Sequence, residues 1–227
     1  MPYKALVFDY DGTIVDTERA VFISWQELFR EHGLELPLSD WDDAVGAAAD
    51  AVDPYAMLAQ RLGQPVDRLA LEVRRRAHEK KLLGNEPLRP GVAALIQDAK
   101  AQGLLLGMAS NSSYRWIEEG LAPYGLLEQF DTVCTPDDGV PPKPDPALYR
   151  LAVERLGVAP SEAVAIEDSP HGAAAARAAG LACVVVPSAL TKGRAFPEGC
   201  IVIDTLEGMS ARRLIAAVSG HLKEDLS

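Results

Sequence analysis

The sequence contains little cysteine and no long hydrophobic run. Its three cysteines, Cys134, Cys183 and Cys200, form no CxxC pair and have no histidine nearby at zinc-ligand spacing, which argues against a zinc site. We therefore expect buried free thiols. The apolar run before Asp9 is too short for a secretory signal or a membrane span. Together these absences predict a cytoplasmic protein.

Basic residues are the minority among the charged side chains. The chain has 22 Lys and Arg against 33 Asp and Glu, a formal net charge of -11, so most of its surface repels phosphate backbones and anionic membranes. We expect neither nucleic acid nor a membrane as a partner. An anionic substrate would then need a local cation, either a basic side chain or a metal ion.

Size and composition are those of a folded protein. An apolar fraction of 48% and a charged fraction of 24%, without a low-complexity block, argue against disorder. The length of 227 residues suffices for one large domain, or for a core domain with a smaller insertion. We expect a monomer.

Apolar runs of strand length alternate with helical patterns along most of the chain. The runs are residues 5–8, 104–109, 163–167, 182–187 and 200–204. Helical spacing of apolar residues, followed by a glycine that can end a helix, occurs over 91–102, 146–157 and 170–180. Nearly continuous apolar strands between helices are typical of a parallel sheet covered on both faces. The predicted fold is a doubly wound, Rossmann-like α/β core.

One long segment interrupts this alternation. Residues 17–86 contain several amphipathic helical patterns that end in glycine, and no convincing strand. We predict a helical cap domain over 17–86, inserted into a core domain made of 1–16 and 87–227. The stretch "GNEPLRPG" before the next core helix has the glycine, asparagine and prolines of a linker.

Polar residues follow three of the predicted strands, where ligands bind in open α/β sheets. The candidates are Asp9, Asp11, Gly12 and Thr13 after the first strand, Ser110 and Asn111 after the second, Glu167 and Asp168 at the end of "AVAIED", and Lys143 within "PPKPDP". Taken singly, Asp-Gly could form a turn and Ser-Asn could cap a helix. Independent turns need not converge at neighbouring strand ends, so we interpret the set as one site.

Four motifs in this order closely resemble those of the haloacid dehalogenase-like superfamily. They are "FDYDGTIVDTE", "ASNSS", "PPKPDPALY" and "IEDSPHGAAAARAAG", and together they span nearly the whole chain. They are similar to the subgroup that contains β-phosphoglucomutase and small phosphatases with a helical cap. The resemblance implies an enzyme that transfers a phosphoryl group.

The resemblance also implies a role for each acid of the first motif. Asp9 would attack phosphorus and form an aspartyl-phosphate. Asp11 would protonate the leaving alcohol and later take a proton from water. Gly12 lets the backbone approach the phosphate, and amide groups of the loop through Thr13 would help to bind it.

A carboxylate that attacks a phosphate dianion needs positive charge nearby. Asp9 and Asp168 are hard oxygen ligands suited to Mg²⁺, and the resemblance adds the main-chain carbonyl of Asp11. Glu167 would either bind the metal directly or orient its ligands, and the residues leave both possibilities open. Lys143 would neutralise charge on Asp9 and on the phosphoryl group, which Ser110 and Asn111 would also bind.

Several other polar or aromatic residues have simpler explanations. We expect His171, in the first turn of a helix, to be solvated rather than catalytic. The run "RRRAHEKK" at 74–81 is typical of a solvated helix face, with a substrate-facing basic patch as the alternative. Trp25, Trp41 and Trp116 are expected to pack in cores or at the cap interface.

Among the functions of the resembled superfamily, the sequence favours a phosphatase. Members that cleave carbon–halogen bonds lack a second aspartate, so Asp11 argues against that reaction. A Schiff-base lysine in the cap would have to be Lys80 or Lys81, and nothing marks either. A β-phosphoglucomutase would have a histidine soon after the first motif and a cap arginine, whereas "DTERAVF" and "VGAAADA" have neither.

We therefore predict a Mg²⁺-dependent phosphatase that acts on a small phosphorylated metabolite. Sugar phosphates, phosphoglycolate and nucleotides are all compatible with the motifs, because specificity resides in the cap. The alternatives are a sugar phosphate mutase, or a phosphate-binding regulatory protein without catalysis.

Overall fold

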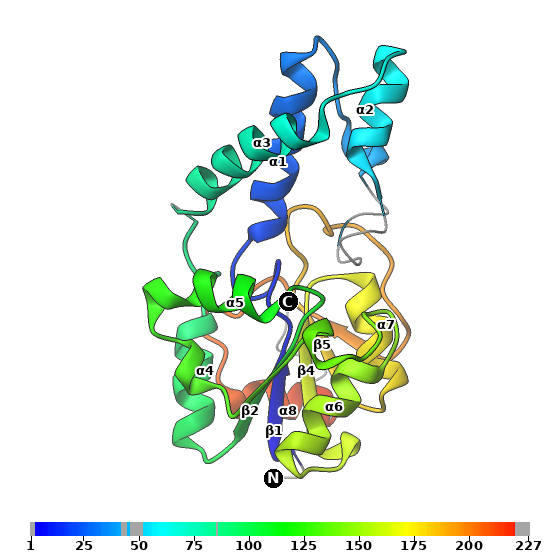
Figure 1. Ribbon diagram of the computed structural model, residues 1–227. Helices are drawn as coiled ribbons and strands as arrows, with labels where there is room; N and C mark the ends of the chain where they lie inside the picture. Colours follow the sequence, from blue (N-terminus) through cyan, green and yellow to red (C-terminus); the bar gives the residue numbers. More distant parts are fainter. Residues whose placement is uncertain (1–2, 42–44, 46–51, 85, 221–227) are drawn as a thin grey trace.

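The core of the protein is a six-stranded, entirely parallel sheet (Figure 1). The computed structural model describes residues 3–41, 45, 52–84 and 86–220. The strands are β1 (Ala5–Phe8), β2 (Leu105–Ala109), β3 (Thr132–Cys134), β4 (Ala163–Glu167), β5 (Ala182–Val185) and β6 (Cys200–Val202). Their order across the sheet is β3-β2-β1-β4-β5-β6, so the chain moves outward from β1 in both directions.

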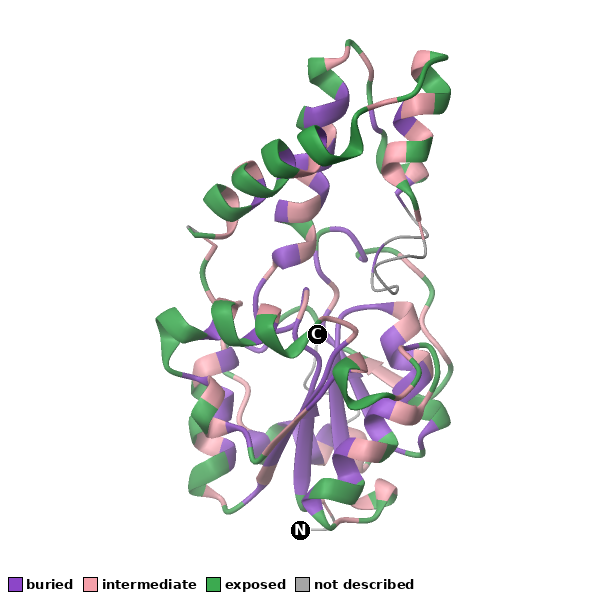
Figure 2. Cartoon of the chain, viewed as in Figure 1, coloured by how far each residue is buried: buried purple, intermediate pink, exposed green. Residues whose placement is uncertain are grey.

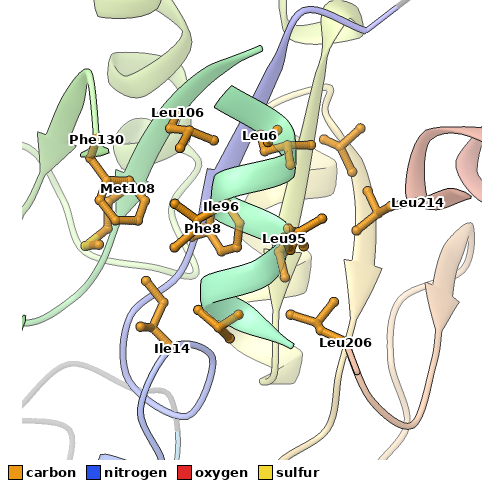
Figure 3. Packing of buried hydrophobic residues seen from close by; sticks show 14 of the residues in the cluster. Leu6, Phe8, Ile14, Leu95, Ile96, Leu106, Met108, Phe130, Leu206 and Leu214 are labelled. Carbon is orange, nitrogen blue, oxygen red and sulfur yellow. The ribbon is translucent and has the colours of Figure 1, made fainter. Parts of the chain in front are cut away.

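Helices cover both faces of the sheet, because side chains alternate along each strand. Leu6 and Phe8 of β1 belong to a cluster with α4 (Val92–Ala101), α5 (Tyr114–Leu121) and α8 (Ala211–Val218), part of which Figure 3 shows. Ala5 and Val7 face a second cluster with α6 (Ala147–Leu156) and α7 (Pro170–Ala178). The central strands are buried on both sides (Figure 2). The predicted doubly wound fold is confirmed.

The prediction from sequence missed β3, α5 and α8. The predicted strands and core helices agree with the observed ones to within three residues at each end. Strand β3 has only three residues, two of them half-buried, and it is defined by its pairing with β2 rather than by an apolar run. Five 3-10 turns join the larger elements, at Leu38–Asp40, Ala122–Tyr124, Leu127–Gln129, Pro136–Asp138 and Pro160–Glu162.

Three helices between β1 and α4 form a separate layer beyond the carboxyl ends of the strands (Figure 1). They are α1 (Thr17–Glu31), α2 (Pro54–Leu62) and α3 (Arg68–Leu83). Their buried apolar side chains, including Trp25, Phe29 and Leu58, form a cluster of their own. The chain leaves and re-enters the core where Val15 and Leu88 pair in an isolated bridge. These features support a cap domain over 17–86, whose boundaries remain a prediction.

The structure shows the state of the three cysteines and the character of the described helices. All three cysteines are free thiols, with Cys134 and Cys183 buried and Cys200 half-buried. No helix in the part of the chain that the structure describes combines the length and the apolar character required to cross a membrane.

Helix α5 supports the loop that follows β1 through a close contact with Tyr10. Tyr10 lies between the two aspartates of the first motif and is almost completely buried. A Cβ atom on Gly120 of α5 would lie 1.8 Å from the Tyr10 hydroxyl oxygen. Only glycine therefore fits at position 120 without moving Tyr10 and the loop.

We expect Gly120→Ala to destabilise the protein although alanine is the better helix former. Helix propensity alone would favour alanine by about 1 kcal/mol. The forced shift of Tyr10 should outweigh this gain and lower the free energy of unfolding by about 1–3 kcal/mol. Gly84→Ala is the control, because Gly84 has a helical φ of -62° and ordinary space around its Cβ. Denaturant unfolding that shows equal stability for Gly120→Ala and the wild type would contradict the packing described here.

Candidate active site

The predicted residues gather at a cleft between the sheet and the three cap helices. The cleft has a volume of about 730 Å³. Asp9, Asp11, Ser110, Asn111 and Lys143 line its core side. The other four predicted residues are not among its lining residues: Gly12, Thr13, Glu167 and Asp168. Of these, Glu167 and Asp168 are buried together with Asp9 and Lys143 beneath the cleft surface.

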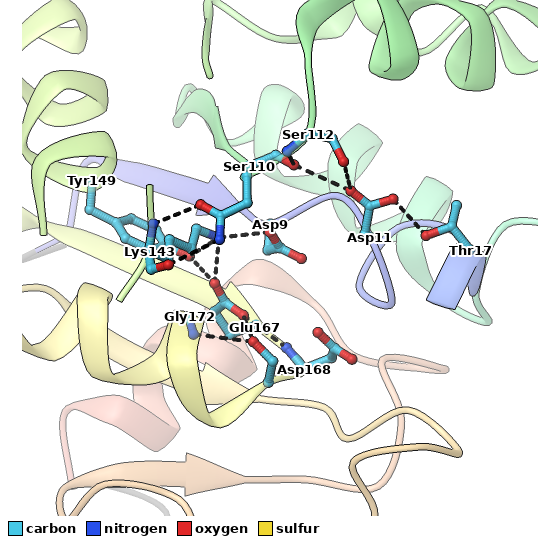
Figure 4. Close-up of polar contacts among 12 residues, drawn as sticks. Asp9, Asp11, Thr17, Ser110, Ser112, Lys143, Tyr149, Glu167, Asp168 and Gly172 are labelled. Carbon is cyan, nitrogen blue, oxygen red and sulfur yellow. Dashed lines mark hydrogen bonds and ion pairs between the residues drawn. The ribbon is translucent and has the colours of Figure 1, made fainter. Parts of the chain in front are cut away.

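Lys143 joins two of the carboxylates. Its Nζ lies 2.6 Å from Asp9 Oδ1 and 2.6 Å from Glu167 Oε1, and its side chain is only 3% exposed (Figure 4). Burial disfavours the charged ammonium, but Asp9 and Glu167 outweigh it and raise the pKa of Lys143 above its usual value. Lys143 is therefore a fixed, charged cation at the floor of the cleft.

Tyr149 and Asn111 hold this lysine in place. The Tyr149 hydroxyl donates to Glu167 Oε1 at 2.6 Å, and the Tyr149 ring lies 4.8 Å from Lys143 Nζ. The Lys143 amide donates to Asn111 Oδ1 at 2.6 Å, while Asn111 Nδ2 donates back to the Lys143 carbonyl at 3.1 Å. The Asn111 amide thus orients the Lys143 backbone, a role not predicted from sequence, where Asn111 was assigned to phosphate. Its contact with phosphate stays a prediction.

Asp9 is the most strongly perturbed carboxylate of the cleft wall. Burial, reinforced by Glu167 and Asp11 and opposed by Lys143, raises the pKa of Asp9 from 3.8 to about 7. The side chain is 10% exposed, so the carboxylate reaches the cleft while most of it is removed from water. A nucleophilic carboxylate here depends on nearby positive charge to remain ionised.

Asp11 is oriented away from the lysine, toward the start of the cap. Its Oδ1 accepts from Thr17 Oγ1 at 2.6 Å and from Trp116 Nε1 at 2.9 Å. Its Oδ2 accepts from Ser112 Oγ at 2.6 Å and from Ser110 Oγ at 3.4 Å (Figure 4). The two aspartates therefore lie in different electrostatic surroundings, as two different roles in catalysis would require.

The residues around Asp11 include three that the sequence did not identify. Thr17 begins α1, Ser112 lies within the second motif, and Trp116 belongs to α5. Trp116 is half-buried and packs against the core, as expected, but its indole also binds Asp11. The second serine of "ASNSS" was the one available signal for Ser112. Thr17 lies near the end of the first motif, "FDYDGTIVDTE", whereas no local pattern marks Trp116.

Gly12 leaves space for Asp168, and Ser110 accepts a hydrogen bond from the loop that follows β2. Gly12 has φ +80°, and a Cβ atom there would lie 2.3 Å from Asp168 Oδ2, so glycine is required to make room for Asp168. Ser110 is fully buried, and its Oγ accepts from the Ser112 amide at 3.0 Å. Thr13 Oγ1 is buried and has no hydrogen-bond partner among the described residues. Binding of phosphate by these three residues stays a prediction.

Asp9, Glu167 and Asp168 form a buried acidic cluster. One oxygen from each lies within 4.8 Å of the others. Burial, and next the charges of Asp9 and Glu167, raise the pKa of Asp168 well above its usual value. Asp168 Oδ2 is buried and has no hydrogen-bond partner in the part of the chain that the structure describes. A buried carboxylate oxygen without a partner, beside a second acid, fits a hard divalent cation such as Mg²⁺.

Glu167 differs from Asp168 because its oxygens are already engaged. Oε1 accepts from Lys143 and Tyr149, and Oε2 accepts from the Asp168 amide at 3.2 Å and from Ser169 Oγ at 3.4 Å. Gly172 of α7 leaves the space for this side chain, since a Cβ atom there would lie 2.0 Å from Glu167 Oε1. Of the two roles left open for Glu167, this geometry favours the orienting one.

Arg89 is a further residue of the site that the sequence placed only in a linker. Its Nη1 donates to the Gly12 carbonyl at 2.5 Å and to the Val186 carbonyl at 2.7 Å, and its Nη2 donates to the Pro187 carbonyl at 2.9 Å. Arg89 therefore ties the loop after β1 to the segment after β5 at the point where the chain re-enters the core.

Two of the simpler explanations need comment. His171 is half-buried, with its Nδ1 3.4 Å from the Val45 carbonyl, and it does not line the cleft.

In the run 74–81, the expectation of a solvated face is wrong for Arg75 and Glu79. Both are buried, they form an ion pair of 2.7 Å, and both line the cleft. Trp25 and Trp41 pack in the cap cluster as expected, and they also line the cleft.

Known proteins share this architecture. The sequence profile of the haloacid dehalogenase-like hydrolases matches residues 3–180. The YhcW protein of Bacillus subtilis is 43% identical over 195 residues, covering 86% of this chain and 88% of YhcW. The validoxylamine A 7'-phosphate phosphatase of Streptomyces hygroscopicus is 33% identical over 190 residues, covering 80% and 84% of the two chains.

A solved structure gives the corresponding likeness in three dimensions. CbbY from Rhodobacter sphaeroides, crystallised in complex with xylulose-1,5-bisphosphate, superposes with a TM-score of 0.74 at 27% identity. The superposition covers 93% of this chain and 99% of CbbY. The likeness therefore extends over both the sheet and the cap.

We expect Mg²⁺ to stabilise the protein, and more strongly at neutral than at acid pH. Without a bound metal ion, as in EDTA, the pKa of Asp9 is higher in the folded protein than in the unfolded chain. Unfolding therefore releases a proton between about pH 4 and pH 7. The free energy of unfolding due to this group therefore falls as the pH rises across that window. A bound cation would offset both causes of the loss, the burial of the ionised carboxylate and the repulsion from the neighbouring acids. The melting temperature in Mg²⁺ should exceed that in EDTA by about 5 °C at pH 8 and by much less at pH 5.

Asp168→Asn provides the matching variant. It should melt higher than the wild type in EDTA at pH 8, since it removes a buried charge, and it should not respond to Mg²⁺. Asp204→Asn, the same change at an exposed position outside the cleft, should keep the full response. A wild-type melting temperature that is independent of Mg²⁺ at pH 8 would contradict the cation site.

Proposed function

The chain belongs to the haloacid dehalogenase-like hydrolases, and from this premise we propose that it is a Mg²⁺-dependent phosphatase of small phosphate monoesters. The observation on which the proposal rests is that the two aspartates of the first motif lie in different surroundings within one cleft. Asp9 lies against a buried lysine, and Asp11 faces the cap side of the same cleft. A nucleophile at the phosphate and an acid at the leaving alcohol would need this arrangement.

In the first proposed step, Asp9 attacks phosphorus and the ester P–O bond breaks. The phosphoryl group becomes bound to the Asp9 carboxylate, and Asp11 gives its proton to the departing alkoxide oxygen, which leaves as an alcohol. Thr17, Trp116 and Ser112 hold Asp11 toward the cap, where the alcohol part of the substrate would lie.

In the second step, Asp11 takes a proton from a water molecule that attacks phosphorus. The bond between phosphorus and the Asp9 oxygen breaks, inorganic phosphate is released, and both aspartates return to their starting states. Lys143 remains charged throughout and offsets the negative charge that both steps concentrate at Asp9. The cap would exclude bulk water during the first step.

Asp9 and Asp168 would hold the Mg²⁺ ion, and the main-chain carbonyl of Asp11 is proposed as a third ligand on the basis of the family resemblance. When bound, the ion neutralises the acidic cluster and the phosphate oxygens. Glu167 would keep its contacts with Lys143 and Tyr149 and orient the site from outside.

Relatives support a phosphatase over the other reactions. The Streptomyces hygroscopicus relative is named as a phosphatase of a phosphorylated metabolite. Asp11 argues against dehalogenation, and a pure binding protein would not need both acids. The cap stretch "VGAAADA", which argued against a mutase, lies outside the described residues except for Val45. The proposed enzyme is a cytoplasmic monomer whose substrate is a sugar phosphate, phosphoglycolate or a nucleotide.

Asp9→Asn should abolish turnover and leave the fold intact. Loss of a covalent nucleophile should reduce kcat by roughly 10³-fold or more. The measurement is phosphate release from sugar phosphates, phosphoglycolate and nucleoside monophosphates, with Mg²⁺ and with EDTA, alongside thermal melting. Asp204→Asn serves as the control. Wild-type turnover in the Asp9→Asn variant would refute the mechanism.

A parallel assay separates the phosphatase from the mutase. β-Glucose 1-phosphate, incubated with the enzyme and Mg²⁺, should either release inorganic phosphate or remain unchanged, because no mutase residues are recognisable in the cap sequence. Formation of glucose 6-phosphate without net phosphate release would establish the mutase instead.

A further inference from the structure

The cap side of the cleft carries three arginines, and each of them is paired with a carboxylate. Arg68 contacts Asp53 at 2.5 Å, Arg75 contacts Glu79 at 2.7 Å, and Arg76 contacts Glu72 at 2.8 Å. All six residues line the cleft. Although this wall is rich in charge, its positive groups are already neutralised.

The pair of Arg75 and Glu79 is the buried part of this wall. The two side chains are 4% and 2% exposed. The Arg75 guanidinium lies 4.6 Å from the centre of the Trp25 ring, and its Nη1 also donates to Ser24 Oγ at 3.3 Å. With Glu72 Oε2 3.5 Å from its Nη2, the guanidinium has four contacts, so it cannot turn freely toward a second anion.

Among the described residues of this wall, a second anionic group on the substrate would find no cation that lacks a carboxylate partner. It would have to displace Glu72 or Glu79 from Arg75, which is buried, or from Arg76, which is exposed, and it would then leave that carboxylate beside the new negative charge. The stretch 42–51, most of which lies outside the described residues, reads "DDAVGAAADA" and contains no Lys, Arg or His. The sequence of that stretch therefore cannot supply the missing charge.

The same wall has unused hydrogen-bonding capacity of the kind that suits hydroxyl groups. Arg75 Nε and Trp41 Nε1 are buried donors without a partner among the described residues. They lie in the wall that also holds the carboxylates of Glu72 and Glu79. A hydroxyl group can accept from such a donor and donate to a carboxylate, whereas a phosphate or carboxylate can only accept. The aromatic faces of Trp25 and Tyr55 complete the wall.

We infer that Glu72, Arg75 and Glu79 select phosphate monoesters whose alcohol part is uncharged and rich in hydroxyl groups. Esters with a second phosphate or a carboxylate are disfavoured. The inference rests on the proposed function and narrows it to sugar and polyol monophosphates, at the expense of phosphoglycolate. It also separates this chain from the Rhodobacter sphaeroides relative, which was solved with a bisphosphate.

Two matched pairs of esters test the selection. Glycerol 3-phosphate and 3-phosphoglycerate differ in an uncharged hydroxymethyl group against a carboxylate. Glucose 6-phosphate and glucose 1,6-bisphosphate differ in one phosphate. In wild-type enzyme, kcat/KM should favour the uncharged member of each pair by at least about tenfold, the effect of one unfavourable charge contact. A preference for the anionic members would overturn the inference.

Glutamine variants identify the residues responsible. Glu79→Gln and Glu72→Gln each remove one of the two carboxylates that Arg75 and Arg76 share, which leaves the wall with one more positive charge, so the ratio of kcat/KM between the members of a pair should fall by at least about threefold. Glu31→Gln is the matched control. It breaks the exposed 2.6 Å ion pair between Glu31 of α1 and Arg74, which lies on α3 like Glu72 and Glu79 but does not line the cleft. If the two cleft variants keep the ratio of Glu31→Gln, the inference is wrong. Should Glu79→Gln not fold, the half-exposed Glu72 carries the test.

A binding measurement keeps this test separate from the proposed function. Calorimetric titration of the Asp9→Asn variant with glycerol 3-phosphate and with 3-phosphoglycerate gives the same comparison without turnover. Tighter binding of 3-phosphoglycerate would overturn the selectivity alone. Absence of phosphate release from every ester by folded wild-type protein would instead overturn the proposed function, while tighter binding of glycerol 3-phosphate would still support the selectivity.

Discussion

The buried ammonium group of Lys143 is the interaction on which the rest of the site depends. It lies between Asp9 and Glu167, each 2.6 Å away, in surroundings where an unpaired charge would be strongly unfavourable. Three carboxylates share this region with one lysine, so the cluster keeps an excess of negative charge. Burial first, and next this excess, raise the pKa values of Asp9 and Asp168, and the excess is the reason that a divalent cation would fit where Asp168 Oδ2 has no partner among the described residues.

The parallel sheet brings these charges together, and small residues allow them to approach. Strands β2, β1 and β4 are neighbours, so the residues that follow them meet at one edge of the sheet. Gly12 leaves the space for Asp168, and Gly172 leaves the space for Glu167. Arg89 then ties the loop that contains Gly12 to the segment after β5. The site is therefore held by backbone contacts as much as by its ion pairs.

The core side and the cap side of the cleft differ in how their charged residues are arranged. On the core side, Lys143 and three carboxylates lie together where the proposed mechanism requires the phosphate, while on the cap side the arginines are paired with their own carboxylates. Asp11 lies at the boundary, bound to Thr17 at the start of the cap and to Trp116 of the core. An acid in this position can serve the oxygen that joins the two parts of a phosphate monoester.

The sequence by itself determined the doubly wound fold, five of the six strands, the helical insertion and the set formed by Asp9, Asp11, Lys143 and Asp168. These follow from apolar periodicity and from motifs of a few adjacent residues, which are local properties of the chain. Only the tertiary structure decided that Trp116 binds Asp11, that Arg89 holds Gly12, and that Asn111 clamps Lys143. Each of these contacts joins residues 32 to 105 positions apart. The charged run on α3 shows the same limit, because spacing alone does not distinguish a solvated arginine from Arg75, whose charge is buried against Glu79 and Trp25.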